Sequence, residues 1–262
     1  HTRYCCGFGY MFVLMIRRPP RSTQSRSSAA SDVYKRQPRF HDDLAWLSTP
    51  VSGGMFEVFD LIGFELIADQ VARHGFKADL IAPLGRSLEE LWELLWVVQR
   101  DHARAPTTLL HGDTHVGNTY LLPGDRGGLL DWQLMMRGSW AHDVTYLLVT
   151  ALDPSVRRVH QLQLLEGYLQ RLDELGVPDV PTTTEAELAY RRAALWGLVI
   201  GWLICPPENY GPEITIANIT RTVAAVSYTH LRAHETVLDL VCRLLLEKKH
   251  PRSTQQTIRV HH

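Results

Sequence analysis

Apolar residues recur at helical spacing in five stretches of the middle of the chain. The first runs from about Phe56 to His74 and is followed by Gly75, a residue that commonly ends a helix. The second opens with Ser87 and Glu90, which have the spacing of a capping box. Its apolar residues fall on one stripe, so this helix should pack one face against a core. The stripe consists of Leu88, Leu91, Leu95 and Val98.

A third stretch, after residue 150, carries signals at both ends of a helix. Asp153 is placed to cap the first turn, Pro154 is tolerated at the first helical position, and Gly176 suits the end. A shorter helix is predicted from Pro212 to about Ala225, because proline again opens an apolar stretch. Helices should therefore fill most of this part of the chain.

The remaining helical stretch is the most apolar part of the middle segment. Thr184 and Glu187 form a second capping-box pattern at its start, and Pro206 ends it. Most of its second half is apolar all round, which predicts a buried helix. Tryptophans on the predicted helices are more typical of a core than of a binding site. They are Trp92, Trp96, Trp196 and Trp202.

Only the centre of the chain has a strand pattern. The short apolar runs "TYLL" and "GLLDW" flank the turn residues "PGDRGG", which indicates a β-hairpin. With the turn centred on Asp125, paired residue numbers sum to about 250, so Thr119 faces Asp131 and Asn118 faces Trp132. The hairpin should therefore bring Asn118 close to Asp131. The fold class predicted from these patterns is α+β and mostly helical.

The stretch "LLHGDTHVGNTYLL" sets four polar residues among apolar ones just before the hairpin. It is too short for an amphipathic helix, so the polar residues need another explanation. Three interpretations are open: a cluster of metal ligands, a phosphoryl-transfer loop, or a polar turn without chemistry. The residues are His111, Asp113, His115 and Asn118.

Asn118 and Asp131 together offer two oxygen ligands, an amide and a carboxylate. Such ligands suit Mg²⁺, which usually takes its other ligands from water and substrate phosphates. Asp113 lies five residues before Asn118, and its free carboxylate suits a general base or a group that orients a hydroxyl. An Asp followed five residues later by Asn, and then by a metal-binding Asp, is the arrangement of the protein-kinase catalytic loop.

The loop and the hairpin together resemble a known family. "LLHGDTHVGNTYLL", followed by "GGLLDWQLMMRGSWAHDVTYLL", is similar to the aminoglycoside phosphotransferase and choline kinase-like family. The resemblance covers roughly residues 50–225 and implies the C-terminal lobe of a protein-kinase-like fold. In that lobe the β-hairpin carries the metal site.

Carried over position by position, the resemblance implies roles for five residues. Asp113 would be the catalytic base of an ATP-dependent phosphotransferase. Asn118 and Asp131 would bind Mg²⁺. His111 would hold the loop, and Asp143, from "AHDVTYLL", would be architectural.

The family's N-terminal lobe has no counterpart in the sequence. That lobe carries a nucleotide-covering loop and a lysine that pairs with ATP phosphates. Lys77 is the only lysine between residues 38 and 225, and it is predicted to lie in a loop beside a helix. "CGFGY", near the start, is too weak a pattern for a glycine loop. We therefore expect a C-lobe fragment, with the N-lobe absent, that binds ATP poorly and turns over slowly or not at all.

The resemblance restricts the acceptor to one class, a small-molecule hydroxyl. Family acceptors bind between the catalytic loop and the late helices, where Glu208, Asn209 and Tyr210 are the candidate acceptor-binding residues. A loop tip between helices, without a ligand, explains these three residues equally well. The acidic charge of the middle segment is compatible with a cationic acceptor such as an aminosugar or choline, and also with an ordinary soluble surface.

Two other functions stay open. A binding module or pseudoenzyme would keep the lobe without its chemistry, although the complete Asp–Asn–Asp set counts against it. A metal-dependent hydrolase would use His111, Asp113 and His115 as alternating ligands. Zinc sites need three or four ligands with supporting contacts, and no histidine-rich partner motif lies elsewhere in the middle segment. Its other histidines are expected to be ordinary surface or core residues: His41, His74, His102, His142 and His160.

Charge divides the chain into three parts. Residues 38–225 hold 14 Lys and Arg against 24 Asp and Glu, a net charge of −10, whereas the two ends together hold 13 against 4. An acidic middle argues against nucleic-acid binding. Residues 17–37 lack periodicity, "PRSTQ" occurs near both ends, and both ends resemble translated sequencing-adapter read-through. The predicted division is a non-native or disordered flank at 1–37, a phosphotransferase C-lobe at 38–225 and a second such flank at 226–262.

No segment predicts a membrane or secretory location. Residues 9–16 are apolar, but basic residues follow rather than precede them and no cleavage site comes next. The nearest approach to a membrane span, residues 193–205, is too short for a bilayer. Cys205 is the only cysteine of the middle segment, which excludes a disulfide framework there. A soluble, cytoplasmic protein is expected, with its oligomeric state open.

Overall fold

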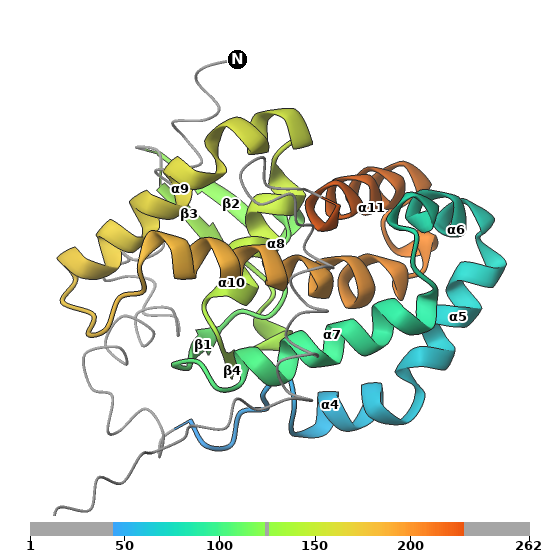
Figure 1. Cartoon of the computed structure of the whole chain (residues 1–262), viewed down its shortest axis with the longest axis horizontal. Helices are drawn as coiled ribbons and strands as arrows, with labels where there is room; N and C mark the ends of the chain where they lie inside the picture. Colours follow the sequence, from blue (N-terminus) through green and yellow to red (C-terminus); the bar gives the residue numbers. More distant parts are fainter. Residues whose placement is uncertain (1–43, 124–125, 228–262) are drawn as a thin grey trace, which may run out of the picture.

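The computed structural model describes residues 44–123 and 126–227 (Figure 1). The flank predicted at residues 1–37 and nearly all of the flank predicted at 226–262 lie outside these ranges. So do other features of the sequence analysis: the apolar stretch 9–16, the pentapeptide "CGFGY", His41, Asp125 and all cysteines except Cys205.

Within the described residues the chain is mostly helical, with two antiparallel sheets of two strands each. None of these helices is both long and apolar enough to cross a membrane. The α-helices are α4 (Gly54–Val58), α5 (Phe64–Arg73), α6 (Gly75–Ile81), α7 (Leu88–His102), α8 (Ala141–Ala151), α9 (Pro154–Glu174), α10 (Thr183–Trp196) and α11 (Pro212–Val226); η1 (Phe59–Gly63) and η5 (Gly197–Leu203) are π-helical. The strands are β1 (Thr108–Leu110), β2 (Thr119–Leu122), β3 (Arg126–Leu129) and β4 (Met136–Gly138), and the short 3₁₀ turns are η2 (Ala82–Leu84), η3 (Val116–Asn118), η4 (Trp132–Leu134) and η6 (Pro207–Asn209).

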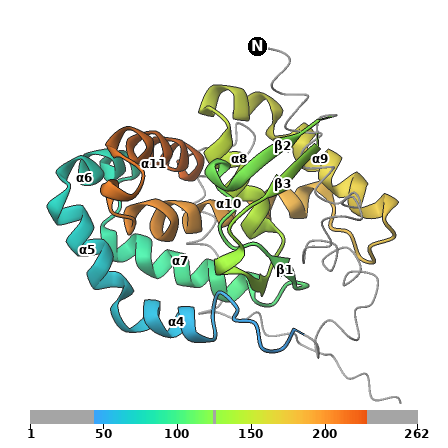
Figure 2. The same ribbon diagram turned by 180° about the vertical axis from the view of Figure 1, so that it is seen from behind.

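Helix α10 and its continuation η5 form the centre of the molecule, with α7, α8, α9 and α11 packed against them (Figures 1 and 2). The predicted apolar stripe of α7 is confirmed, because Leu91, Leu95 and Val98 are fully buried. Each such side chain stabilises the fold by about 1.5–3 kcal/mol. The core tryptophans are confirmed as well: Trp96, Trp196 and Trp202 are buried, and Trp92 is partly buried against the same core.

The first predicted helix, Phe56–His74, is present but contains a π-helical segment. Elements α4, η1 and α5 follow one another without a break from Gly54 to Arg73, and His74 is the capping residue after α5. Gly75 marks the end of this helix as predicted, but it also begins α6. With only seven residues, α6 is too short to give a readable periodic pattern.

Lys77 lies inside α6 and not in a loop as predicted. Its side chain is buried, and its ammonium group donates hydrogen bonds to the carbonyls of Leu203 (2.9 Å) and Cys205 (2.7 Å). These carbonyls lie at the C-terminal end of η5, where a positive charge is favourable. Burial lowers the pKa of Lys77 to about 8. The lysine therefore fastens α6 to the end of η5.

The predicted ends of α7 and α9 are largely confirmed. The Ser87 hydroxyl accepts from the amide of Glu90 (3.2 Å), and the Glu90 carboxylate accepts from the amide of Ser87 (2.8 Å). Pro154 occupies the first turn of α9, and Gly176 follows its end with φ +70°, a left-handed conformation that suits glycine. Asp153 precedes α9, but its side chain makes no capping hydrogen bond.

The capping box predicted for α10 at Thr184 and Glu187 is wrong. It lies two residues earlier, where the amide of Thr182 donates to the Glu185 carboxylate (2.8 Å) and the amide of Glu185 donates to the Thr182 hydroxyl (3.3 Å). Both pairs have the same spacing, so the pattern alone could not choose between them. The backbone decides, because Thr182 is extended and the helix begins at the next residue.

The predicted hairpin is confirmed as β2 and β3, with a small error in register. Thr119 pairs with Leu129, so paired residue numbers sum to 248 and not 250. The difference arises because β3 already includes residues that resemble turn formers. Asn118 therefore faces Leu130, whose amide donates to the Asn118 carbonyl (2.8 Å), and Asp131 comes next in the chain.

Strands β1 and β4 and helix α8 were not predicted. The two strands pair antiparallel from Thr108 opposite Gly138 to Leu110 opposite Met136, and three residues are too few for a pattern. Helix α8 is buried on nearly all sides, so it lacks the polar face by which an amphipathic helix is recognised. These elements enclose the polar loop: β1 leads into it, and α8 lies behind it (Figure 2).

Candidate functional site

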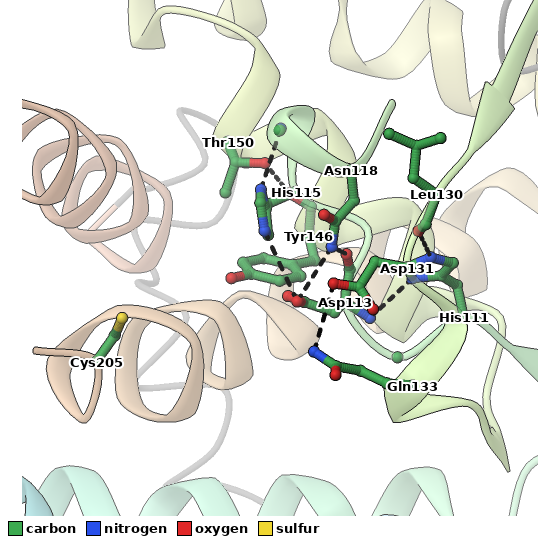
Figure 3. A network of polar contacts seen from close by, with 12 residues as sticks. His111, Asp113, His115, Asn118, Leu130, Asp131, Gln133, Tyr146, Thr150 and Cys205 are labelled. Atoms are coloured by element: carbon green, nitrogen blue, oxygen red, sulfur yellow. Dashed lines mark hydrogen bonds and ion pairs between the residues drawn. The ribbon is translucent and has the colours of Figure 1, made fainter. Parts of the chain in front are cut away.

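The loop between β1 and β2 brings the polar residues of the sequence motif together. It leaves the buried end of β1 at Leu110 and reaches β2 through the 3₁₀ turn η3. Figure 3 shows Asp113, Asn118 and Asp131 gathered beside this loop, with His111 and His115 on either side. Segments more than ten residues apart in the sequence therefore meet at one place.

Asp143, in the first turn of α8, holds the start of the loop. Its two carboxylate oxygens accept hydrogen bonds from the amides of His111 (2.7 Å) and Gly112 (3.0 Å). Its backbone carbonyl accepts from the hydroxyl of Thr114 (2.7 Å). Burial raises the pKa of Asp143 to about 7, although the two amide hydrogen bonds act in the opposite direction. The loop is thus attached to a buried helix at three points.

Gly112 is required by the path of the loop. Its φ of +85° lies in the left-handed region, and a Cβ atom there would overlap the carbonyl oxygen of Leu134. Its own carbonyl accepts a hydrogen bond from Nε2 of His142 (3.2 Å), which is buried in α8. The glycine therefore lets the loop pass between the η4 segment and α8.

His111 connects the loop to the hairpin. Its Nε2 donates to the carbonyl of Leu130 (2.5 Å), and its Nδ1 accepts from the amide of Asp113 (3.2 Å). Burial lowers the pKa of His111, and its ring packs edge-on against Trp132. With both ring nitrogens engaged, His111 has no lone pair left for a metal ion. This argues against the hydrolase interpretation, and no group of three or more His, Cys, Asp or Glu in residues 44–123 and 126–227 is arranged to hold a metal.

Asp113 and Asn118 contact each other directly. The side-chain amide of Asn118 donates to the backbone carbonyl of Asp113 (2.8 Å) and to its Oδ2 atom (3.1 Å). The Oδ1 atom of Asn118 accepts no hydrogen bond from any described residue, so a ligand oxygen stays available. Asp113 is about one-fifth exposed at its side chain and can be reached from solvent.

Asp131 lies beside Asp113 and Asn118 and has an unusual backbone conformation. Its φ of 56° and ψ of 69° are left-handed, which an Asp tolerates better than most residues. Within the described part of the chain its carboxylate accepts one long hydrogen bond, from the side-chain amide of Gln133 (3.4 Å). Such backbone strain is found preferentially at functional sites. The sequence contains no signal for it.

His115 lies in a partly aromatic environment that the sequence did not reveal. Its ring meets those of Tyr210 at 5.6 Å, Trp202 at 6.0 Å and Tyr146 at 6.3 Å, all edge to face. Burial lowers the pKa of His115. Three different elements supply these rings, so only the tertiary fold shows that they surround the loop.

The three candidate acceptor-binding residues are placed differently. The half-exposed Tyr210 lies beside the site, and the pKa of its phenol is raised by burial and by the charges of Asp113 and Asp131. Glu208 is exposed and faces His74 at 3.9 Å. Asn209 lies back against the sulfur of Cys205 (3.6 Å). Tyr210 is the one of the three whose ring contacts His115.

A comparison with family models finds a match to part of the chain. The model described as "Phosphotransferase enzyme family" matches residues 56–181, the segment that contains the loop, the hairpin and Asp143. The match covers slightly less than half of the chain and shows that this segment is similar to that family. The match confirms the resemblance found in the sequence, and the mostly helical fold with small antiparallel sheets is compatible with the C-lobe of a kinase-like phosphotransferase. No curated protein and no solved structure gives a significant match to the chain.

The free energy of unfolding of this protein should fall as the pH drops from 7 towards 4. Burial lowers the pKa of both His102 and His142 to about 4, from 6.5. Between these values the unfolded chain binds more protons, so stability present above pH 6.5 is lost as the pH approaches 4. The pKa of Asp143 is raised from 3.8 to about 7, so this residue gains stability as the pH falls. That gain offsets the loss of stability from only one of the two histidines. We expect a net loss of about 2 kcal/mol, measured by urea unfolding.

Two variants test whether the buried histidines cause this pH dependence of stability. His102→Gln should give a flatter dependence than the wild type, whereas His160→Gln, at a partly exposed position on α9, should leave it unchanged. A stability that stays constant or rises towards pH 4 would contradict the prediction.

Proposed function

We propose that this chain is the catalytic lobe of an ATP- and Mg²⁺-dependent phosphotransferase that acts on the hydroxyl group of a small molecule. The observation that carries the proposal is the contact between Asp113 and Asn118, with Asp131 beside them, inside the segment that matches the family. An Asp, an Asn five residues later and a further Asp after a hairpin form the set that protein kinases use for phosphoryl transfer.

The donor groups fit the proposed ion. Mg²⁺ prefers oxygen ligands, and the unengaged Oδ1 of Asn118 and the carboxylate of Asp131 are both oxygens. When bound, Mg²⁺ would neutralise charge on the nucleotide phosphates. Asp113 itself would accept a hydrogen bond from the acceptor hydroxyl and orient its oxygen, so that positioning supplies much of the catalysis.

A cationic acceptor, such as an aminosugar or choline, is our proposal for the substrate class. Figure 3 shows the carboxylates of Asp113 and Asp131 at the site. Tyr210 lies near enough for both charges to raise the pKa of its phenol. Opposite charge attracts a cation, and an aromatic face adds to the attraction. Glu208 and Asn209 contribute less to this proposal, because their observed contacts are with His74 and Cys205.

The nucleotide-binding lysine has to come from outside the described residues. Lys77 is the only lysine in residues 44–123 and 126–227, and its ammonium group is buried against two backbone carbonyls. It is therefore not available to ATP phosphates. On this basis we propose that the chain, as a C-lobe fragment, binds ATP weakly and transfers phosphate slowly or not at all.

The metal site is tested by ion binding as well as by activity. Mn²⁺, a paramagnetic substitute for Mg²⁺, should bind the chain in the presence of ATP, and Asp131→Asn should weaken binding roughly tenfold or more because a charged ligand is lost. Electron paramagnetic resonance measures the free ion. Asp173→Asn, the same change at an exposed position on α9, should have no effect.

Phosphoryl transfer is tested in the same samples with radiolabelled ATP. Aminosugars and choline are offered as acceptors, with long incubations to detect slow turnover. Labelled acceptor that forms only when Mg²⁺ is present supports the proposal. Ion binding without transfer favours a pseudoenzyme. An affinity for Mn²⁺ that is unchanged by Asp131→Asn contradicts the proposed metal site.

A further inference from the structure

His115 has a buried nitrogen without a hydrogen-bond partner. The whole residue is 6% exposed, and among the described residues nothing hydrogen-bonds to its Nε2 atom. Its Nδ1 atom accepts a hydrogen bond from the amide of Gly117 at 3.0 Å. In a neutral imidazole only one nitrogen carries a proton, so the proton of His115 is on Nε2.

This Nε2–H group is directed at the carboxylate of Asp113. The separation between Nε2 and Oδ2 of Asp113 is 3.7 Å, and Figure 3 shows the ring edge turned towards that oxygen. The distance is longer than a hydrogen bond, as catalytic contacts often are before substrate binds. The same Oδ2 atom accepts the amide of Asn118 at 3.1 Å. Two donors therefore converge on one oxygen, and no described residue donates to the other, Oδ1.

The surroundings of His115 hold its ring in this orientation. Tyr146, Trp202 and Tyr210 pack edge to face around it. A Cβ atom at Gly117 would lie 2.8 Å from Cε1 of His115, so the glycine is what allows the ring to lie over the turn η3. Fixed contacts of this kind are what a group needs in order to orient a catalytic side chain.

We propose that His115 is a positioning residue for Asp113, an inference that rests on the proposed phosphotransferase function. Its Nε2–H and the amide of Asn118 together hold Oδ2, so that Oδ1 faces the acceptor. As the acceptor oxygen bonds to the γ-phosphorus and the bond to the bridging oxygen of ADP breaks, the hydroxyl proton passes to Oδ1. His115 keeps its own proton throughout and touches neither substrate.

Three substitutions separate this role from a purely structural one. His115→Gln retains a donor near the position of Nε2, His115→Asn retains an acceptor near the position of Nδ1, and His115→Phe retains only the ring. If positioning is the role, kcat should fall roughly 10–100-fold in the Asn and Phe variants, with the KM for the acceptor nearly unchanged. The Gln variant should recover most of the loss.

The proposal is overturned if the Asn variant is as active as the wild type, because the Nδ1 contact alone would then explain the histidine. It is also overturned if the Phe variant keeps full kcat. Unfolding midpoints are compared alongside the rates, so that a rate loss that follows only a loss of folded protein is recognised and counted against the role.

A spectroscopic measurement on the full chain does not depend on activity. Long-range ¹H–¹⁵N spectra should show the Nε2–H tautomer of His115, and Asp113→Asn should shift that proton signal. An Nδ1–H tautomer, or a signal indifferent to Asp113→Asn, overturns the proposal. A wild type that shows neither Mn²⁺ binding nor transfer contradicts the phosphotransferase function instead, and the spectrum still decides whether His115 and Asp113 interact.

Discussion

Replacing Asp113 by Asn should lower the rate of phosphoryl transfer by on the order of 10²–10⁴-fold, the usual contribution of a general base. Asparagine has the same shape as aspartate and can still accept the hydrogen bond from Asn118, but it cannot take up a proton. We therefore expect kcat to fall while the KM for the acceptor changes little. Steady-state kinetics on the chain measure both constants, with long incubations if turnover is slow.

Two comparisons keep this result specific to Asp113. Binding of Mn²⁺ in the presence of ATP should survive in Asp113→Asn, because the proposed ligands are Asn118 and Asp131. Asp173→Asn removes the same charge from the exposed face of α9 and should keep full activity. Turnover of Asp113→Asn equal to that of the wild type would refute the role of Asp113 as a base.

The sequence predicted the parts of the site that local spacing controls. A hairpin needs only turn residues between two apolar runs, so its existence was predictable, and with it the approach of Asp131 to Asn118. The register was off because glycines that look like turn residues belong to β3. Asp131 stays next to Leu130, the residue that faces Asn118, so the small error did not separate the two side chains.

Features that depend on contacts distant in sequence could not be predicted. Nothing near His115 indicates that Tyr146 and Trp202 surround it, because these residues come from α8 and η5. The burial of Lys77 depends on the carbonyls of a segment more than 120 residues away. Spacing singled out the polar groups that the fold gathers beside the loop. Their orientation and their hydrogen-bond partners are set by the packing of helices that the pattern located only approximately.

Asp143 shows how such packing controls the loop between β1 and β2. The loop amides of His111 and Gly112 point into the protein, where water cannot satisfy them, and the carboxylate of Asp143 accepts from both. Burial disfavours the charged form of this carboxylate, and the pKa of Asp143 is raised for that reason. A buried acceptor of this kind is retained because two donors would otherwise be left without partners.

Asp143→Ala should therefore lower the free energy of unfolding by about 3–5 kcal/mol, because each buried amide left unpaired costs about 1–3 kcal/mol. Urea unfolding at pH 7 measures the change. Asp143→Asn keeps one carbonyl oxygen and should lose less, whereas Asp173→Ala, at an exposed position on α9, should stay within about 0.5 kcal/mol of the wild type. If Asp143→Ala were as stable as Asp173→Ala, the two loop amides would have found other partners. The attachment of the loop to α8 would then not be what fixes Asp113 in place.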